Sequence, residues 1–220
     1  MKILFKYTTF GRKDWFFSTL DRYYAMIDNK TDFKFVISMN NNDPSMNNDE
    51  VKAKLDCYPN LEYHYGDHSC KIAAVNADMK GQDFDILFLV SDDMIPQVRG
   101  FDNRIREDMK ANFPLLDGAL HYNDGFYGKD RTITLSIMGK ALYDHFGYIY
   151  HPDYKSIYCD NEFTEVVQGM KKVVYSPDVI VKHDWKGGGS SVDGTYHTNS
   201  IRGVRDRDIY LRRKADRFPR

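Results

Sequence analysis

The sequence predicts an α/β domain in which helices flank a mostly parallel central sheet. Three observations support this fold class. Strand-like apolar segments alternate with segments of helical periodicity over roughly the first hundred residues, which is the order expected of right-handed βαβ units. The segment 84–90 is nearly continuously apolar, as in a strand covered on both faces. The chain of 220 residues is long enough for one sizeable core and too short for two comfortable domains.

The first half of the chain contains the clearest alternation of strands and helices. A strand is predicted at 2–7, and the Gly and hydroxyl side chains of 8–12 favour a tight turn into a helix. Phe16, Leu20, Tyr23 and Ile27 then recur on one helical face. The further predictions are strands at 33–39 and 61–65, helices at 49–57 and 72–79, the latter capped by His68 or Ser69, and the apolar strand that ends at 90.

The second half has shorter and less regular elements. Strands are predicted at 115–122, 131–138, 173–175 and 179–181, and helices at 141–146 and 160–170. The helix at 160–170 is indicated by Phe163, Val166, Val167 and Met170, which share one face. No internal repeat or low-complexity domain is present, so we expect one domain followed by a mobile C-terminal segment.

Composition restricts the class of protein. The net charge is −1, from 31 basic and 32 acidic residues, so binding of nucleic acid by the surface as a whole is not expected. Cys57, Cys70 and Cys159 lack metal-type spacing, which favours structural thiols in a reducing compartment. The N-terminal apolar segment is too short for a signal peptide, and no apolar run approaches a membrane span. We therefore expect a cytoplasmic protein.

The apolar strand ends on two adjacent carboxylates, Asp92 and Asp93. Adjacent carboxylates repel each other and lose hydration when they are partly buried, so a divalent cation, or a cation together with ribose hydroxyls, would stabilise them. Ligands also bind at the carboxyl ends of strands in open α/β sheets. The alternative is an ordinary strand end with solvated carboxylates.

Two further sets of chemically capable side chains fall at predicted element ends. Asp160 and Glu162 start a predicted helix, and His183 follows a predicted strand. Each has an ordinary explanation as well, because Asp is a good N-cap, acids favour the positive end of a helix, and a lone His is commonly a hydrogen-bonded surface residue.

The ordered set of these segments resembles the GT-A glycosyltransferases of the family 2 type. The resemblance is carried by 7–12, 71–77, 88–93, 160–162 and 175–183, and it spans roughly residues 2–185. It implies a Rossmann-like GT-A domain at 1–186, with a nucleotide-binding half at 1–95 and an acceptor and catalytic half at 96–186. The segment 187–220 would follow as a basic C-terminal extension.

The resemblance also implies roles for individual residues. Asp93 and His183 would hold Mn²⁺ or Mg²⁺, and Asp92 would contact the ribose. Asp160, with Glu162 as a weaker candidate, would be the general base that deprotonates the acceptor hydroxyl and gives inversion at the anomeric carbon. The other residues assigned to the nucleotide-sugar donor are Thr8, Arg12, Asn40, Lys71 and Asn76.

The chain departs from the family pattern at two places. Many relatives carry an acid after the second strand that recognises the base, whereas this chain has Asn40, Asn41 and Asn42. Asparagine can pair with a uracil edge, so UDP is the first expectation. Many relatives also have Arg where this chain has Val75, and Lys71 or Arg12 would compensate.

The C-terminal extension is strongly basic, with eight basic and three acidic residues from Arg202 to Arg220. It is interpreted as a lid over the diphosphate hinged at Gly187–Gly189, as a helix that packs one side and exposes the other, or as a docking patch for an anionic acceptor such as nucleic acid or a lipid headgroup. Tyr122, Phe126 and Tyr127 are candidates for stacking on a sugar, with core packing as the alternative.

The sequence therefore predicts a metal-dependent, inverting transferase that moves a sugar from a nucleotide sugar, UDP-linked by first expectation, to a hydroxyl of a glycan, protein, lipid or modified nucleic acid. Two alternatives remain. A nucleotidyltransferase would need a Gly-rich basic loop, of which 8–13 is a poor version. A non-catalytic glycan- or nucleic-acid-binding module would bind without turnover.

Overall fold

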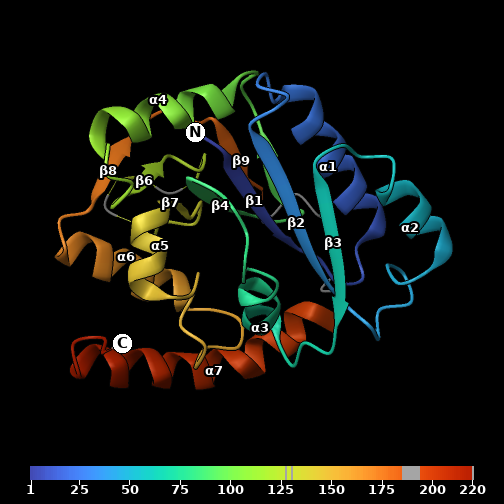
Figure 1. The fold of residues 1–220 in the computed structure, drawn as a ribbon. Helices are drawn as coiled ribbons and strands as arrows, with labels where there is room; N and C mark the ends of the chain where they lie inside the picture. Colours follow the sequence, from blue (N-terminus) through green and yellow to red (C-terminus); the bar gives the residue numbers. More distant parts are fainter. Residues whose placement is uncertain (127, 130, 185–193, 220) are drawn as a thin grey trace.

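A mixed seven-stranded sheet runs through the centre of the molecule (Figure 1). The structure is a computed structural model that describes residues 1–126, 128–129, 131–184 and 194–219, leaving aside the side chains of 194–202. In spatial order the strands are β3 (Leu61–Gly66), β2 (Phe33–Asn40), β1 (Ile3–Thr8), β4 (Ile86–Val90), β7 (Ile137–Gly139), β6 (Ala119–Tyr122) and β8 (Val173–Ser176). Strands β1 to β4 pair in parallel, as do β6 and β8, whereas β7 is antiparallel to both neighbours. The predicted α/β class with a mostly parallel sheet is confirmed.

A second, two-stranded sheet lies at the end of β4. It pairs β5 (Met94–Pro96) with β9 (Val181–His183) in antiparallel fashion. This pairing joins the segment after the acidic strand to a segment almost ninety residues further along the chain.

Helices cover both faces of the central sheet, and each face has its own core. The helices are α1 (Lys13–Met26), α2 (Asp49–Leu55), α3 (Lys71–Asn76), α4 (Phe101–Asn112), α5 (Lys140–Phe146), α6 (Cys159–Gly169) and α7 (Gly194–Ala215). Strand β1 alternates between the faces: Ile3, Phe5 and Tyr7 pack with α1 and α4, and Leu4 packs with α3, α5 and α6. Figure 1 shows α7 on the side of the molecule that carries α3, α5 and α6.

Two strands predicted in the second half are shorter than expected. The segment 115–122 is extended only from Ala119, because Leu116 has a left-handed φ of 57° that a strand does not allow. The segment 131–138 is reduced to Ile137–Gly139 at its C-terminal end, since the Ile133 amide donates to the Thr164 hydroxyl at 2.8 Å instead of to a neighbouring strand.

The predicted boundaries of helix α3 and strand β9 were also wrong. Helix α3 ends at Asn76 because Asp78, with a φ of 60°, turns the chain out of the helix. Its N-cap is Cys70 and makes no side-chain cap bond, so neither His68 nor Ser69 caps it. Strand β9 lies at 181–183 instead of 179–181, where it pairs with β5.

Helix α4 and strand β5 were not predicted from the sequence. Helix α4 is mostly polar, but Phe101, Ile105 and Met109 recur every four residues and are fully buried, so a weak signal was present. Strand β5 has three residues, which is too short for a periodic pattern. The remaining predicted elements are confirmed, with ends that differ by one to three residues.

Helix α7 packs one side against the domain, with Ile209 buried and Leu211 47% exposed. The predicted hinge at Gly187–Gly189 and the candidate stacking residue Tyr127 lie outside the described residues. All three cysteines are free thiols, as predicted, with Cys70 and Cys159 buried. No described helix has both the length and the apolar character that crossing a membrane requires.

Candidate active site

The candidate site lies at the carboxyl ends of the parallel strands. Because β1 to β4 run in the same direction, the loops after β1, β2 and β4 meet at one edge of the sheet. Gly11 has a φ of +70°, a conformation that glycine adopts without strain, and its amide donates to the buried Asp43 carboxylate at 2.7 Å. The acid that joins the first two loops is therefore Asp43, which sequence analysis passed over in favour of the preceding asparagines.

Asp92 is buried beneath this edge. Its Oδ2 accepts a hydrogen bond from the Thr9 hydroxyl at 3.0 Å, and its carbonyl oxygen accepts one from Thr19 at 2.7 Å. Its Oδ1 is buried, and the buried Tyr7 hydroxyl also interacts with this carboxylate. Burial raises the pKa of Asp92 to about 7, against the lowering effect of the Thr9 hydrogen bond. Asp92 is therefore a buried carboxylate at the end of β4, held by Thr9.

The small sheet brings His183 to Asp93. In the β5–β9 register Met94 lies opposite His183, and the Asp184 amide donates to the Asp93 carbonyl oxygen at 2.7 Å. As a result His183 Nε2 is 3.6 Å from Asp93 Oδ2. Burial would raise the pKa of Asp93, but His183, Ser91 and Lys71 together hold it well below its usual range. Asp93 is therefore an ionised carboxylate beside an imidazole.

This pair suits a divalent cation that is shared with a ligand. Nowhere in the described part of the chain do three or more His, Cys, Asp or Glu side chains form a group that could hold a metal ion. Mg²⁺ commonly uses one or two protein ligands together with substrate phosphates. Asp93 and His183 fit that arrangement, with phosphate oxygens and water supplying the other ligands.

Asp160 approaches the same place from α6. It lies in the first turn of the helix, whose N-cap is Tyr158 with a left-handed φ of 64°, so the N-cap role considered for Asp160 was wrong. Burial raises the pKa of Asp160, whereas the charges of Lys71 and His183 lower it. Lys71 and His183 also act on Asp93. Four residues that are far apart in the sequence therefore share one electrostatic environment.

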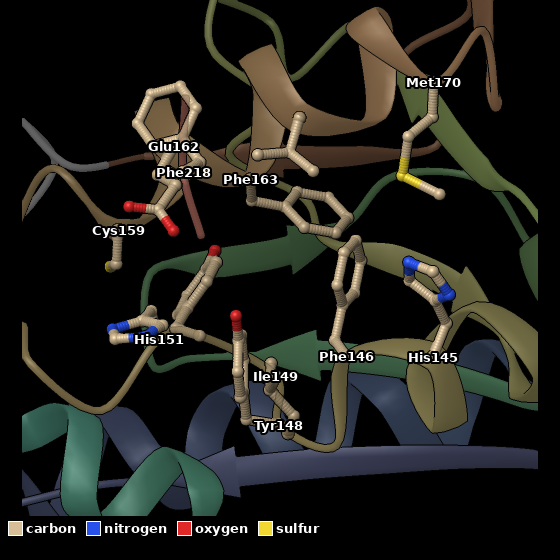
Figure 2. Close-up of a pocket in the computed structure, with 12 residues that line it drawn as sticks. His145, Phe146, Tyr148, Ile149, His151, Cys159, Glu162, Phe163, Met170 and Phe218 are labelled. Atoms are coloured by element: carbon tan, nitrogen blue, oxygen red, sulfur yellow. The ribbon is translucent and has the colours of Figure 1, made fainter. Parts of the chain in front are cut away.

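Glu162 points elsewhere. Residues two apart in a helix lie on different faces, and Figure 2 shows Glu162 at a pocket of about 210 Å³ that is also lined by Phe163, His151 and Phe218. Its carboxylate accepts two hydrogen bonds of 2.8 Å from Arg213 and one of 2.7 Å from the Tyr154 hydroxyl. The geometry supports a structural ion pair for Glu162 and separates it from Asp160.

Two predicted donor-binding asparagines are engaged by the protein itself. The Asn76 side chain accepts hydrogen bonds from the Ile149 and Tyr150 amides at 2.9 and 3.2 Å and donates to the Tyr150 carbonyl at 2.6 Å. It thereby anchors the loop at 149–150. The Asn40 amide group donates to the His68 carbonyl at 3.0 Å, which ties the end of β2 to the loop after β3.

The remaining predicted residues are divided between the site and the core. Thr8 is half-buried at the end of β1, while its neighbour Thr9 makes the contact with Asp92. The positive charge of Arg12 acts on Asp92, and its guanidinium lies 5.6 Å from the Trp15 ring centroid. Among the candidate stacking residues, Tyr122 is buried with its hydroxyl on Asp108 at 2.6 Å, which excludes a sugar, whereas Phe126 is 50% exposed.

Comparison with solved structures shows a GT-A-like fold. The mannosyltransferase PcManGT from Pyrobaculum calidifontis, solved with GDP-Man and Mn²⁺, superposes with a TM-score of 0.71 at 14% sequence identity, over 100% of this chain and 65% of that one. TarS 1-349 from S. aureus, solved with UDP-GlcNAc, gives a TM-score of 0.64 at 14% identity, over 82% of this chain and 57% of that one. The chain thus spans less than two thirds of either protein.

A solved synthase structure is also similar in fold. The 4-diphosphocytidyl-2C-methyl-D-erythritol synthase from Anaerococcus prevotii DSM 20548 gives a TM-score of 0.51 at 13% identity, over 82% of this chain and 89% of that one. No protein-family model matches the sequence, and a comparison with curated proteins gives no match. These likenesses establish the fold alone.

Proposed function

We propose that this chain is a metal-dependent glycosyltransferase that moves a sugar from a nucleotide sugar to an acceptor hydroxyl. The observation that carries the proposal is the approach of His183 Nε2 to within 3.6 Å of Asp93 Oδ2, at the carboxyl edge of a GT-A-like sheet and beside the buried Asp92. The free cysteines favour a cytoplasmic location.

In the proposed complex the nucleotide lies across the loops after β1, β2 and β4. Asp92 is the proposed acceptor of a hydrogen bond from a ribose hydroxyl. Lys71 and Arg12 contribute positive charge toward the diphosphate, since Arg12 acts on the Asp92 carboxylate and Lys71 on that of Asp93. UDP is the proposed carrier, with the end of β2 at Asn40 facing the base.

Asp93 and His183 are the proposed protein ligands of Mn²⁺ or Mg²⁺. When bound, such an ion supplies positive charge that stabilises a nucleoside diphosphate as a leaving group. With two protein ligands, the site is expected to bind the ion weakly alone and tightly together with a diphosphate.

Asp160 is the proposed general base. Its raised pKa brings the carboxylate closer to the range in which it accepts a proton from a hydroxyl at neutral pH. Attack by the acceptor from the side opposite the departing diphosphate gives inversion at the anomeric carbon. Phe126, which is 50% exposed, is the proposed aromatic contact of the acceptor.

Calorimetric titration of UDP tests the metal assignment. Affinity should be at least about 10-fold higher with Mn²⁺ than with EDTA, and Asp93→Ala should remove this difference because one of two ligands is lost. Asp83→Ala is the matched control, since that carboxylate is 91% exposed and precedes the same strand. Equal affinity in Mn²⁺ and EDTA would rule out the metal site, and parallel titrations of GDP and CDP identify the base.

A nucleotidyltransferase is the second candidate. It is favoured because this chain matches 89% of the length of the synthase structure. The two activities release different products. Incubation with nucleotide sugars releases a nucleoside diphosphate if the first proposal holds, whereas incubation with a nucleoside triphosphate and a sugar phosphate releases pyrophosphate if the second does. Binding without either product would favour a non-catalytic module.

A further inference from the structure

Helix α7 contains a buried carboxylate, that of Asp206, which accepts hydrogen bonds from backbone amides. Asp206 is fully buried. Its two oxygens accept from three consecutive amides, those of Lys155 at 3.0 and 3.2 Å, Ser156 at 2.7 Å and Ile157 at 3.0 Å. Hydrogen bonds to a buried carboxylate are shorter and stronger than those between neutral groups. One side chain thus fixes three successive peptide units of a loop that lies about fifty residues away in the sequence.

This loop leads directly into α6, the helix that carries the proposed base Asp160. Tyr158, in the left-handed conformation, follows the three held amides and is the N-cap of α6, and Asp160 lies in the first turn of that helix. A non-glycine residue in this conformation persists only where its surroundings hold it. The orientation of the Asp160 side chain therefore depends on the three peptide units that Asp206 holds.

The same loop contacts α3. The Lys155 carbonyl accepts from the Ile72 amide at 3.4 Å, and Ile72 follows Lys71, the first residue of α3. The loop at 155–157 therefore connects Asp206 to α6, which carries Asp160, and to α3, which carries Lys71.

A second contact between α7 and α6 keeps Asp206 in place. Arg213 lies seven residues after Asp206, on the same side of α7, and binds Glu162 in the first turn of α6. Between them, Ile209 joins the core and the Tyr210 ring stacks on Tyr158 with centroids 5.6 Å apart. The helix therefore contacts Tyr158 and the first turn of α6 along about two turns.

We propose that Asp206 is a positioning residue that orients Asp160 and Lys71 by holding the 155–157 backbone. The inference rests on the proposed function, in which Asp160 is the base. It assigns to the C-terminal helix a role in the architecture of the active site, carried by a residue that touches neither donor nor acceptor.

Asp206→Asn tests the inference, with Asp208→Asn as the matched control. Both substitutions remove one negative charge from α7, but Asp208 is exposed. We expect kcat for sugar transfer to fall at least about 10-fold in Asp206→Asn. The dissociation constant for UDP with Mn²⁺ should rise by a smaller factor, because only the contribution of Lys71 depends on Asp206, whereas Asp92, Asp93 and His183 do not. The Asp208 variant should match the parent. Asp206→Glu, which keeps a carboxylate, should recover part of the loss, and it carries the test if the Asn variant does not fold.

Hydrogen exchange separates this inference from the proposed function. In the absence of any substrate, amides of 155–157 and of the first turns of α6 and α3 should exchange faster in Asp206→Asn, while those of β2 stay unchanged. Unchanged exchange in these segments, or a kcat equal to that of the parent, would overturn the positioning role. Faster local exchange in a protein that transfers no sugar would retain the positioning of Asp160 and reject the glycosyltransferase.

Discussion

Two carboxylates in the first turn of α6 lie in opposite environments. Asp160 is near Lys71 and His183, and its pKa is raised by burial. Glu162 is paired with Arg213 and Tyr154. At the scale of the residue, the surroundings of each carboxylate distinguish a candidate base from a structural acid, because both have the same chemistry and nearly the same place in the sequence.

Asp160→Asn should separate binding from turnover. The substitution preserves shape and removes the proton acceptor, so we expect transfer to fall by roughly 10²-fold or more, with UDP affinity and the thermal midpoint nearly unchanged. Steady-state kinetics and calorimetry on the same preparation measure both. Transfer at the parental rate would exclude Asp160 as the base, and a product with retained anomeric configuration would exclude the inverting scheme.

Strand β1 carries a fully buried lysine on the face opposite Tyr7. Lys6 donates to Ser38 on β2, and Ser38 in turn bonds Asp78 after α3. Burial lowers the pKa of Lys6 to about 8 from an ordinary 10.5, although Asp78 and Glu62 act in the opposite direction. The strand therefore contains a charge whose burial opposes folding at neutral pH.

Comparing the parent protein with Lys6→Met measures the free-energy cost of burying the Lys6 charge. Between pH 8 and 10.5 the folded protein releases the Lys6 proton while the unfolded chain retains it, so stability rises with pH. The free energy of unfolding of the parent relative to Lys6→Met should increase by about 2 to 3 kcal/mol from pH 7 to pH 10. Urea unfolding of both proteins at these pH values gives the difference, and a value independent of pH would contradict the lowered pKa.

The ion pair between α6 and α7 has the character of a buried structural contact, since both side chains are at most 8% exposed. Glu162→Gln leaves Arg213 buried without a countercharge and should lower the free energy of unfolding by about 3 to 5 kcal/mol. Glu165→Gln, which breaks the more exposed pair with Lys214, is the control and should cost less than about 1 kcal/mol.

A double variant distinguishes a structural from a catalytic Glu162. Glu162→Leu together with Arg213→Leu removes both charges and should be more stable than either single variant. If the double variant also transfers sugar at close to the parental rate, Glu162 is structural. A loss of transfer similar to that of Asp160→Asn, in a stable double variant, would restore Glu162 as a catalytic candidate.

In the whole molecule, chemistry is concentrated at one edge of the central sheet and packing elsewhere. The loops after β1, β2 and β4 converge there with β9 and the starts of α3 and α6, while two separate cores support the opposite faces. The pocket in Figure 2 belongs to the α6 side and is lined mainly by aromatic and aliphatic residues. Ligand binding should therefore affect the edge of the sheet and leave that pocket unchanged.

Hydrogen exchange with UDP and Mn²⁺ maps this difference. Amides of 8–12, 71–76 and 91–94 should exchange more slowly on binding, because the nucleotide covers the loops that carry Asp92, Asp93 and Lys71. Amides of 145–151, which line the pocket, should not change. Protection confined to 145–151 would place the nucleotide in the pocket and reject the site proposed here.

Much of the fold was predictable because its elements carry local patterns. The alternation of apolar runs and helical faces, the turn residues after β1 and the two acids after β4 identify the sheet, its direction and the chemistry at its edge. Helix α4 was not predicted because a polar helix has a weak apolar stripe. The starts of β6 and β7 were not predicted because the left-handed Leu116 and the Ile133–Thr164 hydrogen bond leave no periodic signal in the sequence.

The sequence by itself determined the α/β class and the candidates Asp92, Asp93, Asp160 and His183. Only the tertiary structure decided that the β5–β9 register places His183 beside Asp93, that Glu162 faces Arg213, and that Asp206 holds the approach to Asp160. The reason is physical. Periodicity and turn chemistry act between near neighbours in the chain, whereas these contacts join residues from fifty to ninety positions apart, and packing of whole elements brings them together.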